Sequence, residues 1–411
     1  MHVRALFAFT LALTAACSSD PAPDPGAGGS STTSSSSNPG GSGGAGGGVS
    51  AACPEGYPLS AVAGKPVIEA LVDGAGPYSF VFDTGAPTSL LDTSLYKQIG
   101  KGPHQLEIAG KVVTAKVMTS YPVQQYLGST AVSGLLGADV MGQFVVTLDD
   151  ARSRFWLDDT RDEAALAACA HVNGAPAEAA WVEDDYLFVP GNAEGHAGWF
   201  LIDSGASLGA MTKSAFDVLQ AAHPRPALSG FYTPAAAGTF WAELTSIGYL
   251  EVAGLRVEHL LTRTVDDDLV SIPALDGPFL GMLPTGYLRH FLVTLDYPAG
   301  KLRLDGYRDL DPREPSQAFS VGIGLADSSA APVKIAVVLP GSSAAEKGIV
   351  AGDTVVSVSG ADFASLSPAE RPWELMAPTE GATLVVEIEH EGVVQSHALE
   401  ARDLLTDPEL P

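Results

Sequence analysis

Basic residues are scarce in this chain. Only 22 Lys and Arg stand against 48 Asp and Glu in 411 residues, so the formal net charge at pH 7 is −26. Such a charge repels the phosphates of nucleic acids and of anionic lipids, and no basic cluster in the sequence offsets it. We therefore expect no nucleic-acid partner.

Cysteine is also rare, and the three residues are Cys17, Cys53 and Cys169. The nine histidines have neither the spacing nor the cysteine neighbours that zinc sites require, so we expect no metal and no cofactor. The apolar run near the N-terminus, Ala5 to Leu13 after Arg4, is too short to cross a bilayer. It is typical of a secretion signal.

The tract Thr14-Ala15-Ala16-Cys17 follows this run and resembles the lipobox of bacterial lipoproteins. The resemblance implies that residues 1–17 are a lipoprotein signal peptide and that Cys17 is lipidated. The protein would then be exported and anchored to the bacterial cell envelope by its lipid alone, with Ser18 favouring the outer membrane. An ordinary signal peptide cut nearby is the alternative.

Residues 18–54 are mostly Gly, Ser, Thr and Pro with almost no apolar side chain, which predicts a disordered tether. If Cys17 carries lipid, Cys53 and Cys169 are the two cysteines that remain. Export favours a disulfide between them, and two free buried thiols are the alternative.

Two short tracts are the most informative feature: Asp83-Thr84-Gly85-Ala86 and Asp203-Ser204-Gly205-Ala206. Each follows an apolar run, 80–82 or 200–202, and each run is preceded by a turn segment. Each copy therefore predicts a hairpin whose second strand ends in an acid. Two such turns facing each other would form a pair of carboxylates that share a proton.

The repeat continues downstream of both tracts, and each copy contains an apolar segment with glycine, an apolar strand ending in Leu-Asp, and a further strand. These elements are 134–137, 144–149 and 153–157 in the first copy, and 279–281, 291–296 and 301–304 in the second. Their order resembles a lobe of the retropepsin-like and pepsin-like aspartic peptidases.

The resemblance covers roughly residues 55–308 and implies a mainly β fold with two β-barrel lobes. Lobe 1 would be 55–160, the connector 161–176 and lobe 2 177–308. Asp83 and Asp203 are 120 residues apart (203 − 83), whereas Asp149 and Asp296 are 147 apart (296 − 149). The second copy therefore holds 27 extra residues.

The extra residues lie near 228–233 and 238–242, where glycines and aromatic residues are typical of a mobile flap over a bound peptide. In the first copy, 106–110 follows almost directly after a predicted helix, 93–99. We expect lobe 1 to have no full flap, although one-chain peptidases of this kind usually carry it there.

A different unit begins after a charged linker, 309–315. The segment 335–360, with the loop 322–325 before it, resembles a bacterial PDZ domain, which we place at 316–405. The resemblance implies that Gly322, Ile323, Gly324 and Leu325 offer backbone N–H groups to a chain-terminal carboxylate, and that the adjacent strand edge takes up a peptide. The ligand could be a substrate tail, a partner or the end of this same chain.

The peptidase resemblance assigns roles to the two tracts. One of Asp83 and Asp203 would act as base on a water while the other, protonated, donates to the scissile carbonyl oxygen. Thr84 and Ser204 would hydrogen-bond across to the opposite loop. Gly85 and Gly205 would allow the loops to approach closely.

Ala86 and Ala206 match the retropepsin pattern, in which no hydroxyl beside the first acid lowers its pKa, so we expect an optimum between mildly acidic and neutral pH. The predicted function is an aspartic-type endopeptidase of the cell envelope, acting on peptides or proteins. The alternative is a peptide-binding envelope lipoprotein that retains the fold and does not cut.

Overall fold

The computed structural model describes residues 53–62, 64–127, 129–159, 169, 176–178, 180–182, 186–235, 238–267, 275–307, 318–368 and 370–406. Cys17, the predicted signal peptide, the predicted tether up to residue 52 and the predicted linker 309–315 lie outside the described residues, as does most of the connector 161–176. Among the described residues, no helix has the length and apolar character needed to cross a bilayer.

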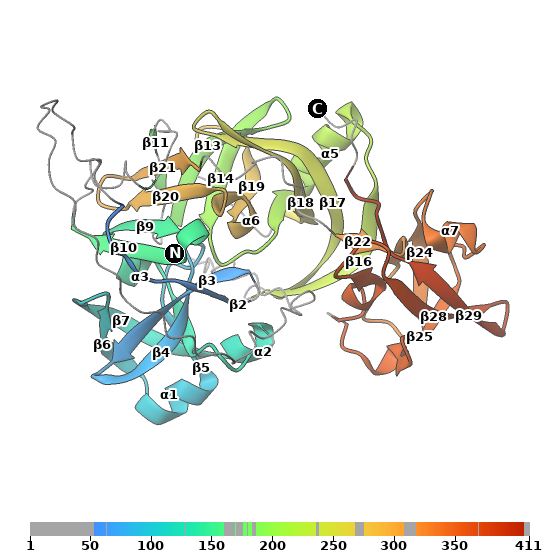
Figure 1. The fold of residues 1–411 in the computed structure, drawn as a ribbon, viewed down its shortest axis with the longest axis horizontal. Helices are drawn as coiled ribbons and strands as arrows, with labels where there is room; N and C mark the ends of the chain where they lie inside the picture. The colour runs from blue at the N-terminus through green and yellow to red at the C-terminus, as the bar shows by residue number, and fades with distance from the viewer. Residues whose placement is uncertain are drawn as a thin grey trace, which may run out of the picture.

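Residues 60–141 form a lobe around a seven-stranded sheet with the order β2-β3-β4-β8-β5-β7-β6 (Figure 1). The predicted helix 93–99 is confirmed as α1, whose N-terminus is capped by Asp92 through the N–H of Ser94 at 2.8 Å. The elements are β2 (Ser60–Val62), β3 (Lys65–Val72), β4 (Ala75–Phe82), β5 (Leu90–Asp92), α1 (Thr93–Ile99), β6 (Gly102–Ile108), β7 (Lys111–Tyr121), α2 (Val123–Leu127), β8 (Gly134–Leu136) and α3 (Ala138–Met141).

Residues 180–288 form a second lobe around an eight-stranded sheet with the order β12-β13-β14-β19-β15-β18-β17-β16. Its strands follow those of the first lobe in order, with one strand added. Its elements are β12 (Ala180–Val182), β13 (Tyr186–Ala193), β14 (His196–Asp203), β15 (Gly209–Thr212), α5 (Lys213–Ala222), β16 (Ala227–Ala235), β17 (Gly238–Val252), β18 (Leu255–Val265), β19 (Phe279–Pro284) and α6 (Thr285–Leu288).

The added strand is β16, which forms a hairpin with the first half of β17. The second half of β17 pairs with β18 as β6 pairs with β7, through the turns Ala253-Gly254 and Ala109-Gly110, in which all four residues have positive φ. In the first lobe β6 begins three residues after α1 ends, and the described segment 93–127 has no counterpart of the β16 hairpin. The structure thus places the long hairpin in the second lobe alone.

The two lobes are joined by a six-stranded sheet with the order β1-β10-β9-β20-β21-β11. The two Leu-Asp strands of the repeat, β9 and β20, are antiparallel neighbours at its centre, where the hydroxyls of Thr147 and Thr294 lie 3.1 Å apart in a buried position. The bounds are β1 (Tyr57–Pro58), β9 (Val145–Asp149), the 3₁₀ turn η1 (Asp150–Arg152), β10 (Arg154–Asp158), β11 (Pro176–Glu178), β20 (Phe291–Asp296) and β21 (Lys301–Gly306).

A disulfide between Cys53 and Cys169 lies beside this sheet and closes a stretch of 116 residues. Both sulfurs pack near Trp156 and Leu292. Among the described residues, the one cluster with metal-binding side chains is this cysteine pair with Asp149. The two cysteine sulfurs of this cluster are bonded to each other in the disulfide.

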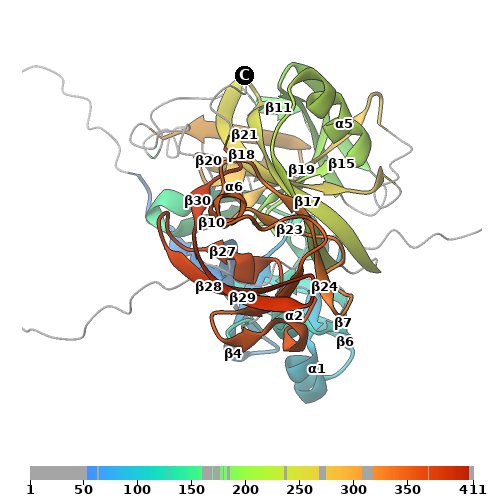
Figure 2. The ribbon, with the colours of Figure 1, turned by 90° about the vertical axis from the view of Figure 1, so that its right-hand side faces the viewer.

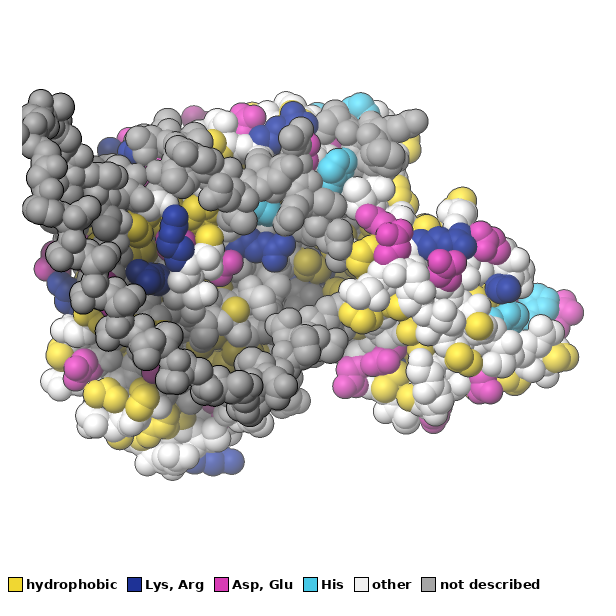
Figure 3. Space-filling model, in the orientation of Figure 1, with side chains coloured by type: hydrophobic (Ala, Val, Ile, Leu, Met, Phe, Trp, Pro, Cys, Tyr) yellow, Lys and Arg dark blue, Asp and Glu magenta, His cyan; other side chains and the backbone are white. Residues whose placement is uncertain are grey.

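Residues 318–406 form a smaller β unit that projects from the second lobe (Figures 1 and 3). Its main sheet has the order β23-β24-β25-β28-β29, with β26 beside β25, and β27-β22-β30 form a second sheet. This unit faces the viewer in Figure 2. The bounds are β22 (Phe319–Ser320), β23 (Ile323–Leu325), β24 (Val333–Val338), α7 (Ser343–Glu346), β25 (Thr354–Val358), β26 (Ala361–Asp362), η3 (Phe363–Ser365), η4 (Trp373–Leu375), β27 (Met376–Ala377), β28 (Thr383–His390), β29 (Val393–Glu400) and β30 (Arg402–Asp403).

Candidate active site

The two predicted acids lie at equivalent places in the two lobes. Asp83 directly follows β4 and Asp203 ends β14, and each of these strands has a parallel neighbour, β8 or β19. The helix after that neighbour holds the acid turn from behind, since the N–H of Ala138 donates to Ala86 O at 2.9 Å and the N–H of Thr285 donates to Ala206 O at 2.8 Å. Each acid is therefore positioned by a strand, a turn and a helix.

Strand pairing aligns the glycines of the two parallel neighbours. Phe80 pairs with Gly134 and Phe200 pairs with Gly281, so Gly134 is the counterpart of Gly281. Both glycines lie where a neighbouring strand crosses too closely for a side chain: an added Cβ would overlap the carbonyl oxygen of Leu90 at Gly134, and a backbone carbonyl of β15 at Gly281.

A reciprocal set of hydrogen bonds joins the two acid turns. The N–H of Thr84 donates to Ser204 Oγ at 3.1 Å, and the N–H of Ser204 donates to Thr84 Oγ1 at 2.9 Å. Each hydroxyl in turn donates to the opposite strand, Thr84 to Ile202 O at 2.8 Å and Ser204 to Phe82 O at 2.7 Å. Both hydroxyls thus form the cross-lobe bonds that the sequence predicted.

The glycines after these hydroxyl residues let the acids meet. An added Cβ at Gly85 would lie 2.6 Å from Asp203 Cγ, and one at Gly205 would overlap Asp83 Cγ. Each carboxyl therefore lies against the glycine of the opposite turn, where any side chain would displace it. The N–H of Gly85 also donates to Asp83 Oδ1 at 2.9 Å, which orients that carboxyl.

Burial controls the charge of this pair. Asp203 is fully buried, and this burial, followed by the charge of Asp83, raises the pKa of Asp203 well above its ordinary value. The charge of Lys65 opposes the shift. Two close carboxyls in such surroundings hold one proton between them, and the pair titrates as a unit.

Two buried cations beside the acids were not predicted. Lys65, at the start of β3, is 1% exposed and donates to Ser207 Oγ at 2.8 Å; burial and then Arg263 lower its pKa to about 8, while both acids oppose the shift. Burial also lowers the pKa of Arg263, on β18, to about 9, against the charge of Asp203. The available signals in the sequence were a lysine directly before the apolar run 66–68 and an arginine in a segment, 260–265, that carries no other charge.

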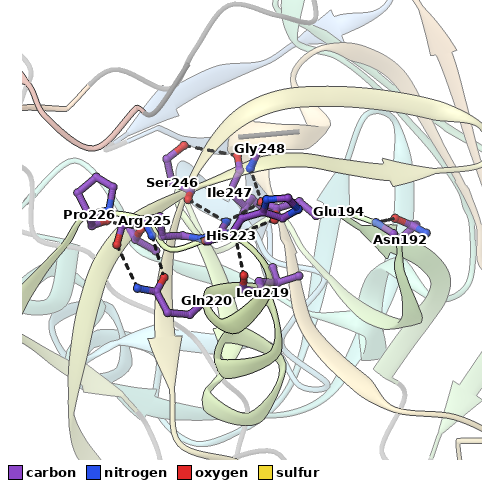
Figure 4. Close-up of polar contacts among 12 residues, drawn as sticks. Asn192, Glu194, Leu219, Gln220, His223, Arg225, Pro226, Ser246, Ile247 and Gly248 are labelled. Carbon is purple, nitrogen blue, oxygen red and sulfur yellow. Dashed lines mark hydrogen bonds and ion pairs between the residues drawn. The ribbon is translucent and has the colours of Figure 1, made fainter. Parts of the chain in front are cut away.

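A buried ion pair holds the base of the second lobe's hairpin (Figure 4). Arg225 precedes β16 and donates through both terminal nitrogens to Glu194, at 2.6 and 2.7 Å, and neither side chain is exposed. The same guanidinium donates to Leu219 O on α5 and to Ser246 O on β17. The helix, the β13–β14 turn and the hairpin are thereby fastened together.

The predicted carboxylate-binding loop lies in the projecting unit, away from the acids. Ile323, Gly324 and Leu325 form β23, and the N–H of Gly322 donates to Ser320 Oγ at 2.9 Å. Gly322 has a φ of +88°, and an added Cβ there would overlap Ser342. The loop therefore requires glycine at this position.

Comparison with known families agrees with this architecture. Residues 68–152 match the aspartyl protease family, and residues 312–389 match the PDZ domain family. The chain carries an aspartyl protease domain followed by a PDZ domain. This order, and the mainly β fold, confirm the predictions from sequence. No curated protein matches the chain. The aspartyl protease match contains Asp83, and the second acid turn lies beyond it.

Proposed function

We propose that this protein is an aspartic-type endopeptidase whose two acids, Asp83 and Asp203, come from two lobes of one chain. The observation that carries the proposal is the reciprocal bonding of Thr84 and Ser204, which holds the acids face to face. Two acid turns joined in this way form a symmetric dyad, and the raised pKa of Asp203 gives the members different protonation states.

The geometry supports a general acid–base mechanism. Asp83 accepts a proton from a water held between the carboxyls while the water oxygen attacks the scissile carbonyl carbon. Asp203 donates its proton to the carbonyl oxygen, which yields a tetrahedral diol. Transfer of a proton to the leaving nitrogen then breaks the C–N bond.

The test compares the full chain with its Asp83→Asn and Asp203→Asn variants on a mixed peptide library from pH 4 to pH 8. We expect either substitution to abolish cleavage. Asp217→Asn is the matched control, because Asp217 is an exposed acid on α5. Cleavage that survives either active-site substitution would rule the mechanism out.

A second candidate function is a peptide-binding protein that does not cut. The observation that favours it is the lack of a β16 counterpart in the described segment 93–127, since a peptide would be covered from one lobe only. The same library distinguishes the two functions. Peptides retained intact by the unaltered chain would support binding without catalysis.

We also propose that the protein is exported and anchored by a lipid on Cys17. The sequence of residues 1–17 supports this, and the disulfide between Cys53 and Cys169 fits an oxidising compartment. The test is detergent-dependent recovery of the full chain from membranes, compared with its Cys17→Ser variant. Equal recovery of both chains in the soluble fraction would contradict the anchor.

A further inference from the structure

The outer edge of β23 is the edge at which a PDZ domain takes up a peptide. β23 is the terminal strand of its sheet. The N–H of Ala326 donates inward to Lys334 O at 2.9 Å. The N–H and C=O groups of successive residues in a strand point to opposite edges. The N–H and C=O of Leu325 therefore face the outer edge.

That edge is covered by the aspartyl protease domain's own hairpin. Ser229 of β16 donates its hydroxyl to Leu325 O at 3.1 Å. An added Cβ at Gly230 would lie 2.5 Å from Leu325 O, and one at Gly324 would lie 2.9 Å from Ser229 N. The two backbones are thus in direct contact, and Figure 1 shows β16 beside the PDZ strands.

A β-bulge brings this segment to the PDZ domain. The pairing of β16 with β17 passes from Leu228 opposite Leu244 to Phe231 opposite Ala242, so Ser229 and Gly230 together face one residue. Gly230 has a φ of +90°, which a residue with a side chain rarely adopts. The bulge therefore turns two residues of the hairpin toward β23.

Phe231 supplies an apolar side chain next to the bulge. Its ring meets Trp373 edge to face with the centroids 4.9 Å apart, and its side chain is 3% exposed. Leu228 belongs to the same apolar cluster, together with Leu339 and Met376 of the PDZ domain. A peptide bound by a PDZ domain lies along the same strand edge and likewise places an apolar side chain in a pocket, so β16 lies where such a peptide would bind.

We propose that Leu228–Phe231 of the hairpin is the resident ligand of the PDZ groove, and that a peptide with an apolar last residue and a free C-terminal carboxylate competes with it. When a peptide displaces β16 from the groove, the hairpin is released except at its base, where Arg225 still holds it. This last step rests on the proposed endopeptidase function, in which the hairpin closes over the bound peptide.

Competition with β16 lowers the apparent affinity of the groove for an added peptide. If β16 occupies the groove in nine molecules of ten, the apparent dissociation constant is about tenfold higher than that of the open groove. Removing the Phe231 side chain weakens the resident contact and leaves β23 unchanged. The substitution should therefore tighten peptide binding, whereas loss of a direct peptide contact would weaken it.

The probe is a fluorescein-labelled hexapeptide ending in Phe with a free carboxylate, titrated against the full chain by fluorescence anisotropy. We expect Phe231→Ala to bind it about tenfold more tightly than the unaltered chain. Phe216→Ala is the matched control, since Phe216 is also 3% exposed but packs in α5 away from the PDZ domain. The hexapeptide with a C-terminal amide should bind far more weakly.

Hydrogen exchange gives a second readout that needs no substitution in the hairpin. The probe should speed exchange at Leu228–Phe231. If Phe231→Ala fails to fold, Gly230→Ala replaces it, with Gly195→Ala as its control: the two glycines have nearly the same φ, and a Cβ at Gly195 meets no atom within 4 Å. Equal probe affinity in all folded chains, or exchange at β16 that the probe leaves unchanged, would overturn the proposal.

Binding is measured in the Asp203→Asn background so that the probe is not cut, and cleavage is measured separately. Cleavage without competition would contradict this inference alone. Competition without cleavage would contradict the endopeptidase function alone.

Discussion

At the scale of single residues, the surroundings of the two acids are less symmetric than their turns. Arg263 of β18 pairs with Ala210, where the first lobe has Thr119 paired with Leu90. Lys65 comes from the first lobe and bonds Ser207 beside the second acid turn. One cation from each lobe thus interacts electrostatically with Asp203, and the charge of Lys65 limits the rise of the Asp203 pKa.

The first prediction concerns Lys65. Its positive charge lowers the pKa of Asp203, so Lys65→Met should raise that pKa further and move the whole pH–rate profile to higher pH. In the unaltered chain Lys65 should lose its proton near its pKa of about 8, so the alkaline side of the pH–rate profile should include this second titration. The measurement is kcat/KM across pH for Lys65→Met, with the exposed Lys213→Met as control. Superimposable profiles would contradict this electrostatic role.

The second prediction concerns the cross-lobe hydrogen bonds. Thr84→Ala leaves the buried N–H of Ser204 without its acceptor, which should cost about 1–3 kcal/mol of unfolding free energy and most of the activity. Thr84→Ser retains the hydroxyl and should retain most of both. Urea unfolding and cleavage rates of the two variants provide the comparison. Equal behaviour of the two variants would mean that the hydroxyl does not join the lobes.

At the scale of elements, the β16–β17 hairpin is held at two places. Arg225 and Glu194 fasten its base, and the bulge at Ser229-Gly230 lies against β23. β16 and β23 are both terminal strands of their sheets. Their contact covers two edges that would otherwise be open to other chains.

The third prediction concerns the base of the hairpin. Arg225→Ala leaves Glu194 buried without its counter-charge and should lower the unfolding free energy by about 3–5 kcal/mol. Replacing both residues by Leu should cost less than the single substitution, because no buried charge then remains. Urea titration of the single and double variants decides this. A double variant no more stable than Arg225→Ala would indicate that packing, and not charge, holds the base.

At the scale of the whole molecule, a single central sheet unites the two lobes, and the disulfide lies at its side. Cys53 precedes the first strand of this sheet, β1, and Cys169 precedes β11, at opposite ends of the strand order. The bridge therefore ties the start of the first lobe to the segment between the lobes.

The fourth prediction follows from the 116 residues that this bridge separates. Constraining so long a loop in the unfolded chain is worth about 2–5 kcal/mol. The Cys53→Ser/Cys169→Ser variant should unfold at correspondingly lower urea concentration, and reductant should lower the stability of the unaltered chain alone. Equal stability of the two proteins in oxidising buffer would show that the bridge does not constrain the chain.

Much of the fold could be predicted because local sequence patterns specify it. The acid turns and the Leu-Asp strands occur twice, and the segment 335–360 follows the PDZ order. A second repeat was available and was missed: Leu106-Glu107-Ile108-Ala109-Gly110 and Leu250-Glu251-Val252-Ala253-Gly254 form the same hairpin. This repeat marks the same place for the extra residues that the segments 228–233 and 238–242 had predicted, between α5 and the second half of β17.

The sequence by itself therefore determined the two acid turns, their hydroxyl and glycine neighbours, and the order of an aspartyl protease domain and a PDZ domain. Only the tertiary structure decided that Lys65 and Arg263 are buried beside the acids, and that β16 covers the PDZ edge. The physical reason is the separation along the chain of the residues that interact. Turns and strands depend on neighbouring residues, whereas the burial of a charge and the covering of an edge depend on segments about a hundred residues away, such as Ser229 and Leu325.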